Sequence, residues 1–557
     1  MKTFSAKGLK ALKLAIVAAP VIGIAGIASA QELKIGLSAE LSSLDPHYHN
    51  LTPNNMLARH IYEPLVGQDE KQQLKPGLAE SWKAIDDTTW EFKLRKNVTF
   101  HDGSPFTADD VIATMQRAPN VPKSPSSFSA YVRGKEFTKV DDFTVRVKTA
   151  TPAPLVPTDL STFGIIPAKC KDTTTEDFNL GKCTTGGTGA YKQAEYVAGD
   201  RVVLTPNETY WGGKEPWSKV TFRMITSAPT RVAALLAGDL DVIENVPTSD
   251  VARLKGDAKL NVSSTVSNRV IYFHMDHFRE VSPFIKGKDG SEIKNPLRNL
   301  KVRQALSMAI NRPGIVERIM EKEAIPAGQL LPDGFFGTSK KLKPVAFDLN
   351  GAKKLLAEAG YPNGFKMKLH GPTNRYLNDT KIIEAGAQMF SRLGIETEVE
   401  TLPSANFFTR ASQGGQGNVP EFSFILVGWG AGTGESSDSL KALLATFDPK
   451  KGMGATNRGR YSNPAFDAKL VEALSTVDDA KRDAALAAAM DIGMNDVGLI
   501  PTHFQLNTWA SRKGVKVQAR TDEYTLAAGI RKDWPDLPIP VRTGLKPGPD
   551  RATLFSC

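Results

Sequence analysis

A glycine-rich stretch around one tryptophan is the first part of the chain whose residue types suggest a chemical task. In "LVGWGAGTGESSDSL", residues 426–440, glycine occupies every second position from 428 to 434. Such a loop could hold a phosphate if its backbone N–H groups converged at the start of a helix. The pattern G-x-G-x-x-G fails because Thr433 stands where the third glycine is required, and no Gly-Lys-Ser/Thr follows. The largely apolar run 422–427 is instead predicted to be a buried strand that leads into a loop with another role.

The remaining residues with catalytic or metal-binding chemistry do not form recognised patterns. His47 and His49 are two residues apart, and His274 and His277 are three apart. Each pair would need ligands from distant parts of the chain to complete a metal site. The sequence holds no H-E-x-x-H, C-x-x-C or G-x-S-x-G pattern. We therefore predict no catalytic residue, no bound metal and no cofactor, with a metal or metal-chelate (nickel-type) receptor and a secreted hydrolase as alternatives.

The first thirty residues have the features of a signal peptide. Four lysines precede the apolar segment "LAIVAAPVIGIAGIASA", and Ala28 and Ala30 satisfy the A-x-A rule for cleavage after Ala30. A retained membrane anchor is the weaker alternative, because the apolar run is short and Pro20 interrupts it. We therefore expect export to the periplasm.

Length and charge limit the class of protein. The chain has 557 residues, enough for two or more domains, and 41% of them are hydrophobic. The formal net charge is +10, of which the four signal lysines contribute four, leaving a mild +6. No arginine run or interleaving of basic and aromatic residues is present, so we predict no nucleic-acid partner.

Two of the three cysteines are placed to form a disulfide bond. Cys170 and Cys183 bracket a short polar segment, and an exported protein meets conditions that permit oxidation. We predict that they pair, with two free thiols as the alternative. Cys557, the last residue, is expected to have no role.

Hydrophobic patterns predict helices alternating with strands, which indicates α/β domains. Residues 89–95 alternate like a strand, with Trp90 on the face of the apolar residues. A helix is expected after the N-cap Thr107, a second after Thr230, and a third after Asn350.

Seven segments, taken together, resemble one protein family. In chain order they read "SLDPH", "IYEPLVGQDEKQQLKPGLAESW", "LRKNVTFHDGSPFTADDV", "GTGAYKQAEYVAGDRVVLTPNETYWGG", "LRNLKVRQALSMAINR", "FDLNGAKKLLAEAGYPNGF" and "NRGRYSNPAFDAKLVEAL". They are similar to the family 5 extracellular solute-binding proteins, the peptide, opine and nickel class of ABC importers. The resemblance implies a periplasmic component that captures a peptide or amino-acid-derived solute and delivers it to an inner-membrane permease. We expect a monomer.

The same resemblance implies the architecture. It is an α/β, two-lobed periplasmic-binding-protein fold (type II-like, large cluster), with an extra subdomain inserted in lobe I. The expected boundaries are 1–30 for the signal peptide, 31–65, 187–270 and 505–557 for lobe I, 66–186 for the extra subdomain, and 271–504 for lobe II. The chain is expected to cross between lobes near Tyr272 and Phe504.

The resemblance also implies where a solute would bind. The cleft is expected to be lined by the loop after the first strand, the extra subdomain, two loops of lobe II and the Gly-Trp stretch. The residues carried over are Ser38, Leu41, Ser42, Tyr131, Arg375, Asn406, Phe407, Trp429, Gly430, Gly432, Thr433, Glu435 and Asp438.

One position departs from the pattern of the peptide-binding members. These have an aspartate, in the order Gly-Trp-x-x-Asp, that accepts the α-amine of the ligand, and Gly432 stands at that position here. Glu435 or Asp438 could take the charge instead, or the ligand could lack an amine there. Trp429 is expected to be a platform for stacking, with a plain core residue as the alternative. Arg375 is expected to pair with a ligand carboxylate, with a surface arginine as the alternative.

Overall fold

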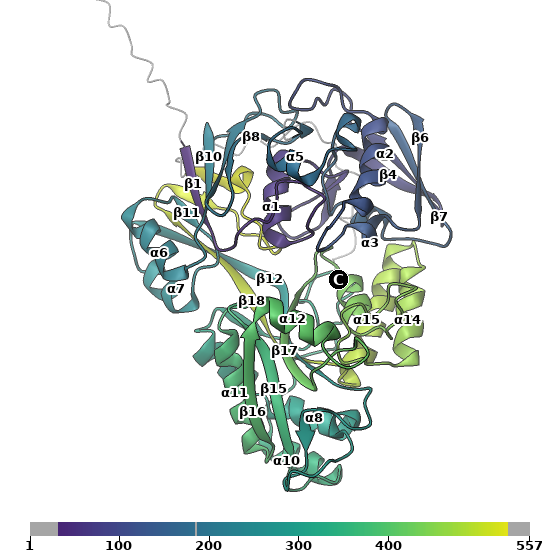
Figure 1. The fold of residues 1–557 in the computed structure, drawn as a ribbon, viewed down its shortest axis with the longest axis vertical. Helices are drawn as coiled ribbons and strands as arrows, with labels where there is room; N and C mark the ends of the chain where they lie inside the picture. The colour runs from purple at the N-terminus through teal and green to yellow at the C-terminus, as the bar shows by residue number, and fades with distance from the viewer. Residues whose placement is uncertain (1–31, 184–185, 533–557) are drawn as a thin grey trace, which may run out of the picture.

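The computed structural model describes residues 32–183 and 186–532 (Figure 1). The signal segment, its cleavage point and Cys557 lie outside the described residues. Among the described helices, none combines the length and apolar character that a membrane crossing requires.

A 12-stranded mixed sheet runs through the molecule and joins its two main parts. Its strands follow the order β13-β15-β17-β12-β18-β11-β1-β10-β9-β8, with β16 beside β15 and β14 beside β18. The long strands β12 (Leu260–Met275) and β18 (Ile500–Arg512) lie in the middle and run from the upper part of Figure 1 to the lower part. This sheet therefore connects segments far apart in sequence.

The upper part, which holds the N-terminal strand, is built around β1 and its neighbours. Strand β1 pairs in parallel with β10 and β11, and β8, β9 and β10 pair antiparallel. Its elements are β1 (Glu32–Leu37), α1 (Thr52–Ile61), β8 (Tyr191–Val197), β9 (Arg201–Pro206), β10 (Lys219–Met224), α6 (Ala228–Ala237), β11 (Val242–Ile243), α7 (Thr248–Lys255), β19 (Val515–Val517) and β20 (Ile530–Lys532).

The lower part has helices on both faces of its strands. Successive residues of β12 face opposite sides, so Phe273 packs into one hydrophobic core and Tyr272 into the other. The elements are β13 (Ile285–Lys286), α8 (Leu300–Ala309), α9 (Arg312–Gly314), β14 (Ala324–Pro326), α10 (Leu349–Glu358), β15 (Lys366–Thr373), α11 (Asp379–Arg392), β16 (Glu396–Pro403), α12 (Ser404–Gln413), β17 (Phe424–Gly430), α13 (Ser436–Leu443), α14 (Pro464–Leu474) and α15 (Asp479–Asn495).

A separate four-stranded sheet, in the order β4-β5-β7-β6, lies at the upper right of Figure 1. Trp90 of β5 lies on the face that packs onto its core, as the alternating pattern predicts. This region comprises β2 (Val66–Gln68), β3 (Leu74–Pro76), β4 (Ala79–Asp86), β5 (Thr89–Leu94), α2 (Ala108–Arg117), α3 (Ser129–Val132), β6 (Lys135–Asp141), β7 (Thr144–Thr149) and α4 (Val156–Asp159). Helix α5 (Thr175–Asn179) follows, and its Phe178 packs into the core that contains Leu33 of β1.

The pairing of β12 with β18 is interrupted where the two parts meet. The ladder runs to Val266, opposite Leu506, and resumes at Val270, opposite Phe504. From Arg269 onward β12 also pairs with β17. The interruption leaves three buried polar residues, Ser267, Asn268 and Arg269, at the junction between the parts.

The helix starts agree only partly with the sequence pattern. Helix α2 begins after Thr107, whose backbone N–H donates to the Asp110 carboxylate at 2.8 Å. The predicted cap Thr230 is wrong, because α6 begins three residues earlier, after Ser227. Pro229 fits the first turn of the helix, where backbone N–H groups have no partner within the helix and its missing N–H therefore costs nothing. Asn350 is wrong too, since Asp348 accepts from the Gly351 N–H and caps α10.

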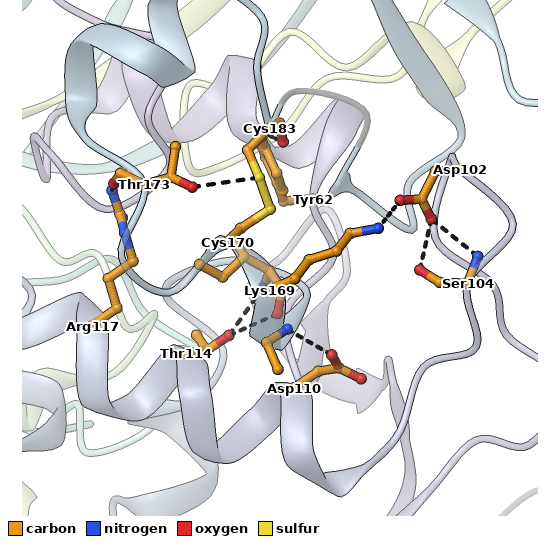
Figure 2. The surroundings of a disulfide bond; sticks show 12 residues. Tyr62, Asp102, Ser104, Asp110, Thr114, Arg117, Lys169, Cys170, Thr173 and Cys183 are labelled. Carbon is orange, nitrogen blue, oxygen red and sulfur yellow. Dashed lines mark hydrogen bonds and ion pairs between the residues drawn. A yellow bond between two sulfur atoms is a disulfide. The ribbon is translucent and has the colours of Figure 1, made fainter.

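The predicted disulfide bond between Cys170 and Cys183 is confirmed (Figure 2). The two Cα atoms are 6.2 Å apart. The Thr173 hydroxyl donates to the Cys183 sulfur at 3.6 Å. The loop is also fixed by Arg117 of α2, which donates to the Thr173 carbonyl at 3.0 Å.

Candidate functional site

The end of β17 lies at the junction of the upper and lower parts, and its glycines allow close packing there. A Cβ atom at Gly428 would lie 2.9 Å from the ring of Tyr376, whose hydroxyl donates to the Gly428 carbonyl at 3.1 Å. A Cβ atom at Gly430 would lie 3.2 Å from a guanidinium nitrogen of Arg269. Glycine therefore lets Tyr376 and Arg269 lie directly against the strand.

The Gly-Trp loop (residues 428–434) is held by a side chain from the β2–β3 hairpin. Gln72 donates to the carbonyl oxygens of Ala431 and Gly432, each at 3.2 Å. Asn268, at the interruption of β12, donates to the Gln72 side-chain oxygen and to the Ala431 carbonyl, each at 2.8 Å. Three segments distant in sequence thus fix one loop.

Trp429 and Asp438 form a pair beside this loop. The Trp429 indole N–H donates to the Asp438 carboxylate at 3.2 Å, and the half-buried ring packs against the core that contains Leu440. Desolvation is the main cause that raises the pKa of Asp438 to about 6. Burial, and then the Asp438 charge, raise the pKa of Tyr131, whose hydroxyl accepts from the Asn50 amide at 3.3 Å.

Glu435 is neutralised within the protein. Arg482 of α15 donates to both Glu435 oxygens at 2.9 Å, and the Ser437 hydroxyl donates to the same carboxylate. Glu435 is 5% exposed and Arg482 is 6% exposed. The Arg482 guanidinium also lies over the Phe336 ring, 4.2 Å from its centroid. The pair therefore anchors the start of α13.

Arg375, on the segment between β15 and α11, has no carboxylate partner within the described part of the chain. Its guanidinium lies over the Tyr376 ring at 5.0 Å, and its backbone N–H donates to Asp379 at 2.8 Å. The nearby Arg269 is different, because Glu523 accepts from it at 2.7 and 2.9 Å. Desolvation, and then the Arg269 charge, lower the pKa of Arg375. Arg375 thus carries an exposed positive charge that forms no ion pair with a carboxylate of the described residues.

Several other residues that the resemblance carried over have contacts of their own or lie exposed. Ser38 donates to Glu244 through both its N–H and its hydroxyl, at 2.9 and 3.0 Å. The Ser42 hydroxyl lies 2.8 Å from His49 Nδ1. Asn406 is exposed on α12.

Two apolar residues of that set lie in cores. Leu41 is 5% exposed and Phe407 is 0% exposed, with its ring stacked on Phe422. Neither offers much surface to a solute in this conformation. Neither Leu41 nor Phe407 is therefore part of the proposed solute site.

The positions around Gly432 differ in exposure. Gly432 is exposed, and no atom lies within 4 Å of a Cβ built there. Thr433 is 8% exposed, and its carbonyl accepts from Gln68 at 3.4 Å.

Sequence reasoning missed Gln72, Asn268, Arg269 and Tyr376. Only Tyr376 could have been found, because it follows Arg375 directly.

Comparison with known families identifies the protein class. The family model described as "Bacterial extracellular solute-binding proteins, family 5 Middle" matches residues 73–451. The chain belongs to this family. Family 5 membership makes it a solute-binding component of a transport system and agrees with the resemblance seen in the sequence.

Individual relatives cover most of the chain. Heme-binding protein A of Haemophilus influenzae is 29% identical over 479 residues, which are 81% of this chain and 82% of the relative. The glutathione-binding protein GsiB of Escherichia coli is 28% identical over 478 residues, 85% of this chain and 89% of the relative. The solved structure of the E. coli murein tripeptide binding protein MppA, 26% identical, matches with a TM-score of 0.71 over 91% of this chain and 99% of that one. The predicted periplasmic-binding-protein fold is confirmed.

The histidines that a metal receptor could use as ligands contact other groups of the protein instead. His47 Nε2 lies 2.8 Å from the Gly164 carbonyl, and Arg117 lies 3.0 Å from its Nδ1. His277 Nε2 lies 3.0 Å from the Gly498 carbonyl. Within residues 32–183 and 186–532, no three His, Cys, Asp or Glu side chains are grouped to hold a metal ion.

Buried histidines should make the protein less stable in acid. Burial lowers the pKa values to about 4 or about 3, from 6.5, for His47, His60, His274, His277, His370 and His503. Between these values and pH 6.5 the unfolded chain binds more protons than the folded chain. The free energy of unfolding should therefore fall as the pH drops from about 6.5 to about 4, by at most about 1.4 kcal/mol per pH unit for each histidine.

Urea denaturation at pH 7 and pH 5 checks this prediction. His370 is the best position to vary, because its ring stacks on Phe422 at 4.1 Å and neither ring nitrogen has a hydrogen-bond partner among the described residues. Its Nε2 lies 3.6 Å from the Glu400 carboxylate. His370→Phe should keep the stacking and reduce the loss of stability between the two pH values. A loss equal to that of the parent protein would contradict the assigned role of burial.

Proposed function

We propose that this protein is the periplasmic receptor of an ABC importer and that it binds a peptide or another amino-acid-derived solute at the junction around β17. It would then deliver the solute, as a monomer, to an inner-membrane permease. The upper part with the small sheet and the lower part would act as the two lobes that close on the solute. The names of relatives support the solute class, because they include glutathione and a murein peptide.

The observation that carries this proposal is that the exposed guanidinium of Arg375 forms no ion pair with a carboxylate of the described residues. A planar guanidinium binds a carboxylate through two parallel hydrogen bonds. Tyr376 supports the Arg375 side chain, and Glu523 already neutralises Arg269. A solute carboxylate is thus the partner that Arg375 lacks.

We further propose that the protein carries out no chemical step. The side chains around the end of β17 include the Trp429 indole with the Asp438 carboxylate, the amides of Gln72 and Asn268, and the Arg269–Glu523 ion pair. A hydrolase would need a nucleophile hydrogen-bonded to a base, or two carboxylates facing each other across a substrate. Arg375, Trp429, Gln72 and Asn268 form neither arrangement.

Titration calorimetry on residues 31–557, unfolded and refolded to remove any bound solute, tests the function. The probes are reduced glutathione, murein tripeptide, heme and a Ni(II)–histidine complex. We expect glutathione or the tripeptide to bind in the micromolar range or tighter. Saturable binding of heme or Ni(II)–histidine alone would contradict the proposed solute class, and so would no binding at all.

Arg375→Ala should weaken binding of the peptide probe about tenfold, or about 1.5 kcal/mol, because a charged hydrogen-bonded contact is lost. Arg392→Ala, at the far end of α11, is the matched control and should leave the affinity unchanged. The dissociation constant from calorimetry is the measurement. Equal affinity of Arg375→Ala and the parent would show that the solute carboxylate lies elsewhere.

A further inference from the structure

The tip of the β2–β3 hairpin (residues 68–73) contacts the Gly-Trp loop from the opposite side of the junction. We propose that Gln72, at this tip, is a latch that stabilises the closed arrangement of the upper and lower parts without contacting the solute. This inference rests on the proposed function, because it concerns the closing of the two parts on the same solute. Gln72 is then a positioning residue that raises the affinity of the site.

The hairpin tip is fixed to the upper part of the molecule. The Thr521 backbone N–H donates to the Glu70 carbonyl at 2.9 Å. The Arg520 guanidinium donates to the Asp69 carbonyl at 2.8 Å. Tyr524, in the same segment as Arg520 and Thr521, packs against the hydrophobic core that surrounds β1. The hairpin tip therefore moves with the upper part.

The Gly-Trp loop is fixed to the lower part. It continues β17, which pairs with residues 269–275 of β12, and Trp429 packs against a core of the lower part that contains Leu440. The ladder between β12 and β18 is interrupted between Val266 and Val270, where this pairing begins. A rotation of the two parts about this interruption would separate the hairpin tip from the loop.

The side-chain amide of Gln72 crosses between the two parts. Its Nε2 donates to the carbonyl oxygens of Ala431 and Gly432, each at 3.2 Å. Its Oε1 accepts from the Asn268 amide at 2.8 Å. Gln72 is only 4% exposed, so these bonds are shielded from water. Because a hydrogen bond inside the protein is on balance more favourable than the bonds with water that replace it, the contact favours the closed arrangement.

The backbone of Gln72 is held in a conformation that this residue type rarely adopts. Its φ is 60°, in the left-handed region that favours glycine and asparagine. Such a conformation persists only where the surroundings fix it. The Asp69 carboxylate contributes, because it accepts from the backbone N–H groups of Lys71 and Gln73 at 2.9 and 2.8 Å. The turn therefore orients the Gln72 amide independently of the loop that it binds.

Gly434 allows the hairpin to come this close to the loop. Its φ is +72°, and a Cβ atom built there would lie 2.5 Å from the Gln72 Cβ and 3.0 Å from the Gln72 carbonyl oxygen. Any larger residue at 434 would push the hairpin tip away. The Thr433 carbonyl accepts a further, longer bond from Gln68 at 3.4 Å. The hairpin tip and the loop are thus complementary in shape as well as in hydrogen bonding.

A latch changes the affinity for a solute that it does not touch. A solute that contacts both parts binds the closed arrangement, so its apparent affinity is proportional to the fraction of the protein that is closed. The bonds of Gln72 raise this fraction. Their loss should weaken the binding of every solute that requires closure by a similar factor.

Gln72→Met tests the inference, because methionine keeps the length of the side chain but cannot donate to the loop. Small-angle X-ray scattering of residues 31–557, refolded without solute, should give a larger radius of gyration for Gln72→Met than for the parent. Saturating glutathione or murein tripeptide, whichever binds, should bring both proteins to the same value. The dissociation constant from calorimetry should rise about fivefold in Gln72→Met.

Gln73→Met is the matched control, because Gln73 is the exposed neighbour in the same turn, and it should behave like the parent. Thermal melting confirms that each variant is folded. Equal radii of gyration for the solute-free parent and Gln72→Met would overturn the inference. A larger radius that saturating solute leaves unchanged would also overturn it. If no probe binds but the solute-free radii differ as expected, the latch stands and the proposed solute class fails.

Discussion

Arg482→Ala is expected to lower the free energy of unfolding by roughly 3–5 kcal/mol, because it leaves the Glu435 carboxylate buried without its counter-charge. Both side chains are almost fully covered, and the guanidinium donates to both carboxylate oxygens. The loss includes the contact of Arg482 with the Phe336 ring. Urea denaturation at pH 7, followed by circular dichroism, measures the change.

The double variant Arg482→Met/Glu435→Gln separates the two contributions. It removes both charges and keeps similar volumes, so most of the lost stability should return. A double variant as unstable as Arg482→Ala would show that packing on Phe336, rather than an unpaired charge, causes the loss. A change below about 1 kcal/mol in Arg482→Ala itself would place the pair among weak surface ion pairs.

Trp429→Ala is expected to weaken binding of the peptide probe by about 2 kcal/mol or more, a factor of about 30. The reason is the position of the ring, which is half-buried at the end of β17 and donates to the partly exposed Asp438. A desolvated aromatic platform of this kind contributes much of the energy of a binding site. Calorimetry gives the affinity and a thermal melt gives the stability.

Trp429→Phe separates stacking from hydrogen bonding. Phenylalanine retains an aromatic face but cannot donate to Asp438, so it should recover most of the affinity lost in Trp429→Ala. Unchanged affinity in Trp429→Ala, together with a lowered melting temperature, would show that the tryptophan is only a core residue.

The parts of the fold that sequence reasoning could predict depend on local chemistry. The alternation of Trp90 with polar neighbours, the start of α2 at Thr107 and the pairing of Cys170 with Cys183 each follow from a few adjacent residues or from short spacing. The predicted N-caps Thr230 and Asn350 lie three and two residues after the observed ones, Ser227 and Asp348. Several polar residues near each helix start could serve as the N-cap, so the local pattern does not choose between them.

The organisation of the site depends on contacts between distant segments, and local patterns do not contain them. Gln72 binds the Ala431 carbonyl 359 residues further along the chain. The sequence shows that Glu435 and Asp438 both follow Gly432, but not that Arg482 of α15 pairs with Glu435. The pairing of Glu435 with Arg482 is therefore visible only in the packed structure.

A crystal structure of residues 31–557 with the bound peptide probe tests the central claim most directly. We predict that the solute lies against the Trp429 ring. Its carboxylate should be at hydrogen-bond distance, about 2.7–3.2 Å, from the Arg375 guanidinium. A solute bound away from the end of β17, with Trp429 and Arg375 outside contact distance, would contradict it.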